Sequence, residues 1–167
     1  TQSRSSAASD VYKRQYRRYG YGTSAFGEGW ALYSEQLALE AGLATDPYDE
    51  IGILQSELFR AVRLVVDTGI HYKKWTREEA MNYMKEKTGM SDTEVRSEIE
   101  RYIVWPAQAL SYKVGMLKVL ELRQLAMDAL GNDFNYKEFH SILLDNGEPP
   151  LFILEELVKN WIALKQS

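Results

Sequence analysis

The sequence predicts an all-α protein of about six or seven helices, and two observations lead to this prediction. Apolar side chains recur at steps of three and four in one segment after another, which is the period of an amphipathic helix. No segment shows the sustained alternation of apolar and polar residues that is typical of hairpins. Because there is no internal repeat and no long linker, we expect residues 16–167 to form one helical domain.

The first predicted helix spans residues 25–42 and ends at Gly42. Its apolar stripe consists of Phe26, Trp30, Tyr33 and Leu37. A proline opens the second helix at Pro47, and Gly69 is its expected end. The stripe expected to face the core from this second helix consists of Ile51, Leu54, Leu58, Val62 and Val65.

The remaining helices are predicted from capping signals and prolines. Two capping boxes open helices over residues 77–87 and 93–102, and they consist of Thr76 with Glu79 and of Ser91 with Glu94. A long helix is expected from Pro106 to Leu130, followed by a stop at Gly131. Shorter helices are expected over residues 136–144 and 151–165.

The first fifteen residues differ from the rest of the chain. They are polar, rich in serine and without a helical period, which is typical of a disordered tail. The stretch SSAASDVYKRQ also resembles a translation artefact derived from a sequencing adaptor. We therefore exclude residues 1–15 from the fold and expect the natural sequence to begin near Tyr16.

The composition excludes several kinds of site and partner. With 45% hydrophobic and 26% charged residues, the chain is typical of a globular protein. A formal net charge of -4 gives no reason to expect nucleic acid as a partner. No apolar run is long enough for a transmembrane segment. The absence of cysteine excludes disulfides and thiolate metal sites.

The stretch FGEGWALYSE, at residues 26–35, carries the strongest chemical signal. Glu28 stands between two glycines, and Glu35 returns to the same helix face about 10 Å further along the axis. Glycine weakens a helix interior by about 1 kcal/mol, a loss that is tolerated where something approaches the backbone closely. Glu28 is therefore a candidate metal ligand. The alternative is a frayed helix start, where glutamates are favoured by the helix dipole.

A second pattern, RLVVDTGIHYKKW, places Arg63, Asp67 and His71 at steps of four. These side chains share a face while the helix lasts, so they can pair. A carboxylate orients a histidine ring and favours the imidazolium, which suits a group that stabilises a transition state. The alternative is a histidine that caps the negative end of the helix. His140, which follows Phe139 in the middle of a helix, is expected to be structural.

Two resemblances extend these observations. AFGEGWALYSE resembles the helix that supplies the third zinc ligand in gluzincin metallopeptidases, whose other two ligands are histidines of an HExxH helix. Four blocks together resemble a bacterial family, the domain of unknown function numbered 885: EGWALYSE, RLVVDTGIH, RYIVWPAQALSYKVG and FHSILLDNGEPPL. The blocks extend from Glu28 to Leu151, so the resemblance covers most of the sequence.

The resemblance implies a zinc-dependent metallopeptidase that hydrolyses peptide bonds, with Glu28 as the third zinc ligand. It implies that a peptide oxyanion is stabilised by His71 and Tyr112, with Tyr102 as a lesser candidate. Groups that support the ligands or bind the substrate are then Glu35, Asp67 and Arg63. Lys113 either meets a substrate carboxylate or is solvated.

One departure from the family pattern limits this interpretation. The chain has two histidines and no HExxH motif, which in the resembling family lies upstream of EGWALYSE. We therefore expect the C-terminal part of a peptidase, inactive by itself, with an exposed apolar patch where the other part packs. The periplasm or the cell surface is the expected location, because resembling proteins often carry secretion or lipoprotein signals. The alternative function is a non-catalytic helical module that binds a peptide or protein.

Overall fold

The computed structural model describes residues 22–167 of the chain. This part contains seven α-helices and two short 3₁₀ helices, and its one β-type contact is an isolated bridge between Gly22 and Glu148. The all-α prediction is therefore confirmed. The expected tail, residues 1–15, lies outside the described residues.

The helices follow one another along the chain with short connections. Their bounds are α2 Ser24–Glu40, α3 Pro47–His71, α4 Arg77–Thr88, α5 Asp92–Val104, η1 Gln108–Leu110, α6 Ser111–Leu130, η2 Gly131–Asp133, α7 Tyr136–Leu144 and α8 Leu151–Lys165. Both predicted capping boxes form, at the starts of α4 and α5. Within residues 22–167, no helix is long and apolar enough to cross a membrane.

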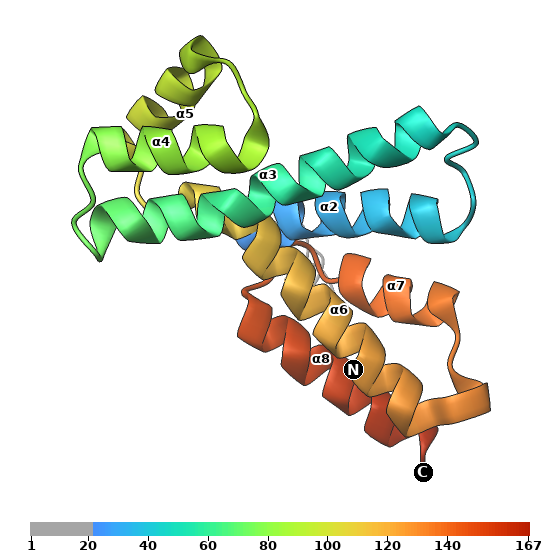
Figure 1. The fold of residues 1–167 in the computed structure, drawn as a ribbon. Coiled ribbons are helices and arrows are strands. Elements are labelled where there is room, and N and C mark those ends of the chain that lie inside the picture. The colour runs from blue at the N-terminus through green and yellow to red at the C-terminus, as the bar shows by residue number, and fades with distance from the viewer. Residues whose placement is uncertain (1–21) are drawn as a thin grey trace, which may run out of the picture.

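Two hydrophobic cores organise these helices. α2 and α3 form a helical hairpin, and α4 and α5 lie along the half of α3 that is far from the hairpin loop (Figure 1). α6 begins beside α2 and runs away from α3, with α8 packed along it (Figure 1). One core joins α2, α6, α7 and α8 around Tyr33, Leu122 and Phe139. The other joins α3, α4, α5 and η1, with Met84 and Ile99 among its buried residues.

Glycines permit the close crossing of α2 and α6. A Cβ atom on Gly29 would lie 2.5 Å from the Cα atom of Gly115, and one on Gly115 would lie 2.8 Å from the Cα atom of Gly29. Because real Cβ atoms do not approach so closely, neither position accepts a side chain without a shift of backbone. The second glycine of Gly-Glu-Gly is thus required by packing against the SYKVG segment.

The second helix continues past its predicted end. α3 runs to His71, whereas the sequence predicts a stop at Gly69. Gly69 lies against the indole of Trp75, and a Cβ atom there would come within 2.5 Å of the ring. The backbone N–H of Trp75 donates to the carbonyl of Gly69 at 2.9 Å. Gly69 therefore serves close packing of the following loop and keeps a helical conformation.

The predicted start of the long helix at Pro106 is wrong. α5 ends at Val104, Ala107 adopts a left-handed conformation with φ of 67°, and the 3₁₀ helix η1 intervenes before α6 starts at Ser111. The backbone N–H of Ala107 donates to the Asp67 carboxylate, at 3.1 Å to one oxygen. This tertiary hydrogen bond holds the turn, and the local sequence pattern does not reveal it.

The predicted core stripe of α3 is mostly exposed. Val62 is 5% exposed, but four other members of the stripe are between 39% and 58% exposed: Ile51, Leu54, Leu58 and Val65. The buried apolar side chains of α3 are Val62 and Val66, because α4 and α5 cover only that face and only the second half of the helix. These four residues form an exposed apolar stripe on α3, and its packing against a further portion of polypeptide stays a prediction.

We expect Gly115→Ala to destabilise the chain by about 1–3 kcal/mol, because the added methyl group overpacks the crossing of α2 and α6. Gly52→Ala is the matched control, since a Cβ atom at that position would have no neighbouring atom within 4 Å and glycine weakens a helix interior. That control is expected to stabilise by about 0.5–1 kcal/mol. Urea unfolding measures the free energy of unfolding of both variants, and equal values would contradict the packing role of Gly115.

Candidate functional site

Glu28 lies on the face of α2 that also carries Leu32 and Glu35. Its side chain is half-buried, and within residues 22–167 it has no hydrogen-bond or ion-pair partner. α2 begins at Ser24, so Glu28 lies beyond the first turn of the helix. The helix dipole acts most strongly within that first turn. The structure therefore gives no support to the alternative in which Glu28 serves as a cap of the helix.

Glu35 connects α2 to α3 through a chain of hydrogen bonds. The Ser56 hydroxyl donates to a Glu35 carboxylate oxygen at 3.3 Å. Arg60 Nη1 in turn donates to the Ser56 hydroxyl at 2.8 Å and to the Ser56 carbonyl at 3.3 Å. Glu35 thus contacts α3 and has no hydrogen bond to Glu28 within residues 22–167, and its role in supporting a ligand or binding the substrate stays a prediction.

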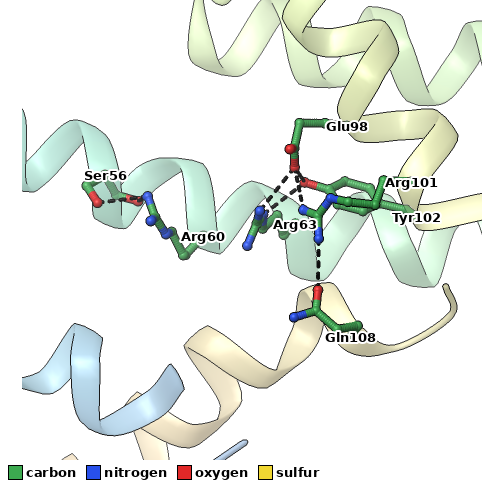
Figure 2. Close-up of polar contacts among 7 residues, drawn as sticks. All are labelled: Ser56, Arg60, Arg63, Glu98, Arg101, Tyr102 and Gln108. Carbon is green, nitrogen blue, oxygen red and sulfur yellow. Dashed lines mark hydrogen bonds and ion pairs between the residues drawn. The ribbon is translucent and has the colours of Figure 1, made fainter. Parts of the chain in front are cut away.

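Arg63 is the centre of the largest polar cluster in the described part of the chain (Figure 2). Its side chain is 6% exposed, its Nε donates to the Tyr102 hydroxyl at 2.9 Å, and its Nη2 donates to Glu98 at 3.0 Å. Arg101 also donates to Glu98, at 2.7 Å, and to Gln108 of η1 at 2.9 Å. The cluster therefore ties α3, α5 and η1 together.

The cluster shifts the pKa values of its members. Burial alone would raise the pKa of Glu98, but hydrogen bonds from Arg101, Tyr102 and Arg63 lower it overall. Burial raises the pKa of Tyr102, and the hydrogen bond to Glu98 raises it further. Tyr102 is therefore a neutral phenol at physiological pH, and its hydroxyl is already engaged between Arg63 and Glu98.

Tyr112 lies beside two guanidinium groups at the start of α6. The Cζ atom of Arg63 is 4.7 Å from the centre of the Tyr112 ring, and that of Arg60 is 5.7 Å away. Phe59 packs against the same Arg63 group, at 4.5 Å. One Arg63 nitrogen, Nη1, is buried and has no hydrogen-bond partner in the described part of the chain, and the surrounding ring faces add cation–π attraction to the ion pair with Glu98.

Asp67 and His71 share a face of α3 but bind different groups. Asp67 is 2% exposed and accepts from Ala107, whereas His71 Nε2 lies 2.9 Å from the carbonyl oxygen of Tyr102. Since a carbonyl oxygen only accepts, Nε2 carries the proton. Burial raises the pKa of Asp67, while the Ala107 N–H and the charge of His71 oppose the rise. The two side chains are thus coupled by charge, and no hydrogen bond joins them.

The two remaining candidates are structural. Lys113 is 9% exposed and its ammonium group is paired with Glu57, so the expectation of a solvated lysine is wrong. His140 Nε2 lies 2.9 Å from the Tyr33 hydroxyl in the core of α2 and α7, as expected for a structural histidine. Burial lowers the pKa of His140, and the nearby charge of Arg123 lowers it further.

The structure brings some predicted residues together and leaves others apart. Arg63 contacts Tyr102 and Tyr112, and His71 reaches the backbone of Tyr102. Among residues 22–167, no hydrogen bond or ion pair joins Glu28 to either His71 or Tyr112, and no group of three or more histidine and acidic residues could hold a metal ion. A metal site that uses Glu28 therefore requires ligands from elsewhere.

Sequence reasoning missed several members of these networks, among them Ser56, Arg60, Glu98, Arg101 and Gln108. Their helical spacing gave a usable signal, since Ser56 and Arg60 are four positions apart, as are Glu98 and Tyr102. Such spacings are common on exposed helix faces, so the sequence does not distinguish a buried network from a solvated pair.

The comparisons with known proteins identify relatives of this chain. The family described as "Bacterial protein of unknown function (DUF885)" matches residues 2–158. No curated protein matches. One similar crystal structure, named a "putative lipoprotein" from Colwellia psychrerythraea, has a TM-score of 0.83 and 55% identity, over 85% of this chain and 24% of that chain.

A second similar structure, named a "putative lipoprotein of unknown function" from Shewanella oneidensis, has a TM-score of 0.79 and 27% identity. The match covers 83% of this chain and 26% of that chain. The chain therefore spans about a quarter of the length of these two solved relatives.

We expect Arg63→Met to destabilise the chain by about 3 kcal/mol, because it leaves a partly buried Glu98 carboxylate without its buried partner. Arg96→Met is the control, since Arg96 is exposed and forms no ion pair in residues 22–167; its effect should stay within about 0.5 kcal/mol. Urea unfolding compares Arg63→Met with Arg96→Met, and similar midpoints would mean that the polar cluster around Arg63 contributes little to stability.

The raised pKa of Asp67 predicts a pH dependence of stability. The folded state binds a proton at Asp67 more readily than the unfolded state does, so this residue makes stability fall as pH rises above the ordinary aspartate pKa of about 3.9. Asp67→Asn keeps an acceptor for Ala107 but does not titrate. The free energy of unfolding of the wild-type chain should therefore decline relative to that of Asp67→Asn as pH increases through this window. A difference that is constant with pH, or that changes in the opposite direction, would contradict the assignment.

Proposed function

Because this chain belongs to the bacterial family of unknown function DUF885, we propose that it is the C-terminal part of a zinc-dependent metallopeptidase that hydrolyses peptide bonds. The observation that carries the proposal is the state of Glu28. It is a half-buried carboxylate beside the Gly29 crossing, with no partner within residues 22–167, and carboxylate oxygen is a ligand that zinc accepts.

The other two ligands of the proposed site come from polypeptide outside this chain. His71 and His140 are engaged with Tyr102 and Tyr33, so neither is placed to join Glu28. The two solved relatives are about four times as long as the part that this chain matches, which leaves ample sequence for an HExxH-type helix. Zinc bound there would polarise the peptide carbonyl and lower the pKa of a water molecule.

The chain's own residues would then act on the charge that develops during hydrolysis. Tyr112 donates a hydrogen bond to the oxyanion from its hydroxyl, which has no partner within residues 22–167. The guanidinium groups beside its ring, Arg60 and Arg63, add positive charge near that oxygen. His71 keeps only Nδ1 for a contact with the substrate, because its Nε2 is held by the Tyr102 carbonyl.

The location and the alternative function follow from other observations. Both solved relatives are named as lipoproteins, so we place the whole protein at the cell surface or in the periplasm. The exposed apolar stripe of α3 favours the alternative, a non-catalytic helical module that binds a peptide or protein through this face. The two functions differ in whether zinc is bound and in whether peptides are cleaved.

The test uses the longer polypeptide that includes the upstream coding sequence. We expect one zinc ion per chain by elemental analysis, and cleavage of a peptide library detected by mass spectrometry. Glu28→Gln should lose both, because it removes an anionic ligand. Tyr112→Phe should keep the zinc and lose about 10²–10³-fold in kcat.

Glu121→Gln is the matched control, since Glu121 is exposed on α6 and among residues 22–167 pairs only with Lys118; this variant should retain zinc and activity. A longer protein that binds no zinc, or a Glu28→Gln variant that binds it as tightly as the wild type, would support the helical module.

A further inference from the structure

Arg60 differs from the other partly buried arginines of the described residues. Arg63, Arg77, Arg101 and Arg123 each have a carboxylate within ion-pair distance, whereas Arg60 has none in residues 22–167. Its Nη1 is bound by Ser56, but its Nε is buried and has no hydrogen-bond partner among residues 22–167. A partly desolvated cation that lacks an anion is costly, which points to a partner that the described chain does not supply.

One nitrogen of the Arg60 guanidinium is left for an anion. Nε is enclosed by the protein, so an external ligand reaches the group at Nη2, which makes no hydrogen bond within residues 22–167. A charge-assisted hydrogen bond from Nη2 would bind one oxygen of a carboxylate. Ser56 at the opposite end and the rings of Phe59 and Tyr112, at 5.2 and 5.7 Å, fix the plane of the group.

Arg60 also lines a hollow large enough for a side chain. The hollow has a volume of about 260 Å³ and lies between the middle of α3 and the connection from α4 to α5. Its walls are both apolar and polar, and they include Gln55, Ser56, Phe59, Arg60, Thr88 and Met90. The Gln55 side chain forms no hydrogen bond within residues 22–167 and is exposed, so its amide is free to meet a ligand.

We propose that the hollow beside Arg60 binds a carboxylate of the substrate, with the adjoining side chain against Phe59 and Met90. The assignment to a substrate rests on the proposed function. Arg60 lies 5.7 Å from the centre of the Tyr112 ring, so the hollow that Arg60 lines is next to the residue proposed to stabilise the oxyanion. The carboxylate is either the C-terminus of the peptide or the side chain of an acidic residue.

The experiment measures the binding of small probes to the zinc-free 167-residue chain by nuclear magnetic resonance titration. N-acetylphenylalanine carries only an α-carboxylate, N-acetylglutamic acid α-amide carries only a side-chain carboxylate, and N-acetylphenylalaninamide carries neither. We expect a carboxylate probe to bind at least about tenfold more tightly than the neutral amide. Preference for the first probe identifies a C-terminal carboxylate as the ligand, and preference for the second identifies an acidic side chain.

Variants test whether Arg60 is responsible. Arg60→Gln should abolish the preference for the carboxylate. Arg60→Lys should retain only part of it, because lysine keeps the charge but lacks the planar guanidinium that Ser56, Phe59 and Tyr112 hold in place. Arg96→Gln, at an exposed arginine, is the control and should behave as the wild type. Equal binding of neutral and charged probes, or an unchanged preference in Arg60→Gln, would overturn the proposal.

The two proposals fail separately, because probe binding needs no zinc. If the chain prefers carboxylates but the longer protein binds no zinc, the binding site is supported and the peptidase proposal is rejected. If the longer protein is a zinc-dependent peptidase but the chain shows no preference for carboxylates, the peptidase proposal is supported and the site at Arg60 is rejected.

Discussion

The close approach of α2 to α6 at Gly29 and Gly115 sets the positions of Glu28 and Tyr112 relative to each other. With no side chain between the two helix backbones, Glu28 and Tyr112 are carried by elements whose relative position cannot change without a clash. α3 then joins this pair to the second core through Arg63, which contacts Tyr112 on one side and Tyr102 and Glu98 on the other. The two cores thus share a polar connection whose centre is one buried cation.

Much of this fold is encoded locally and could be predicted. The starts of α4 and α5 follow from their capping boxes, and the last two helices follow from turn and proline signals, because these features act within a few residues. The end of α3 and the start of α6 could not be predicted. Gly69 and Ala107 owe their conformations to Trp75 and Asp67, which are contacts of tertiary structure.

The candidate site likewise combines features that are encoded locally with features that depend on tertiary contacts. Sequence resemblance selected Glu28, and helical spacing selected Arg63, Asp67 and His71 as one face of a helix, which α3 confirms by extending to His71. What each side chain binds depends on segments distant in sequence. The attachment of His71 to a backbone carbonyl and the use of Asp67 to hold a turn are examples, and so is the pairing of Lys113 with Glu57.

The exposed stripe of α3 has a thermodynamic consequence. The heat capacity change of unfolding increases with the apolar surface that becomes hydrated, about 12–15 cal/mol/K per residue for ordinary domains. Because Ile51, Leu54, Leu58 and Val65 are already in water in the folded chain, their exposure adds little to that change. The chain therefore has a flatter curve of stability against temperature than a domain of its length that buries all four.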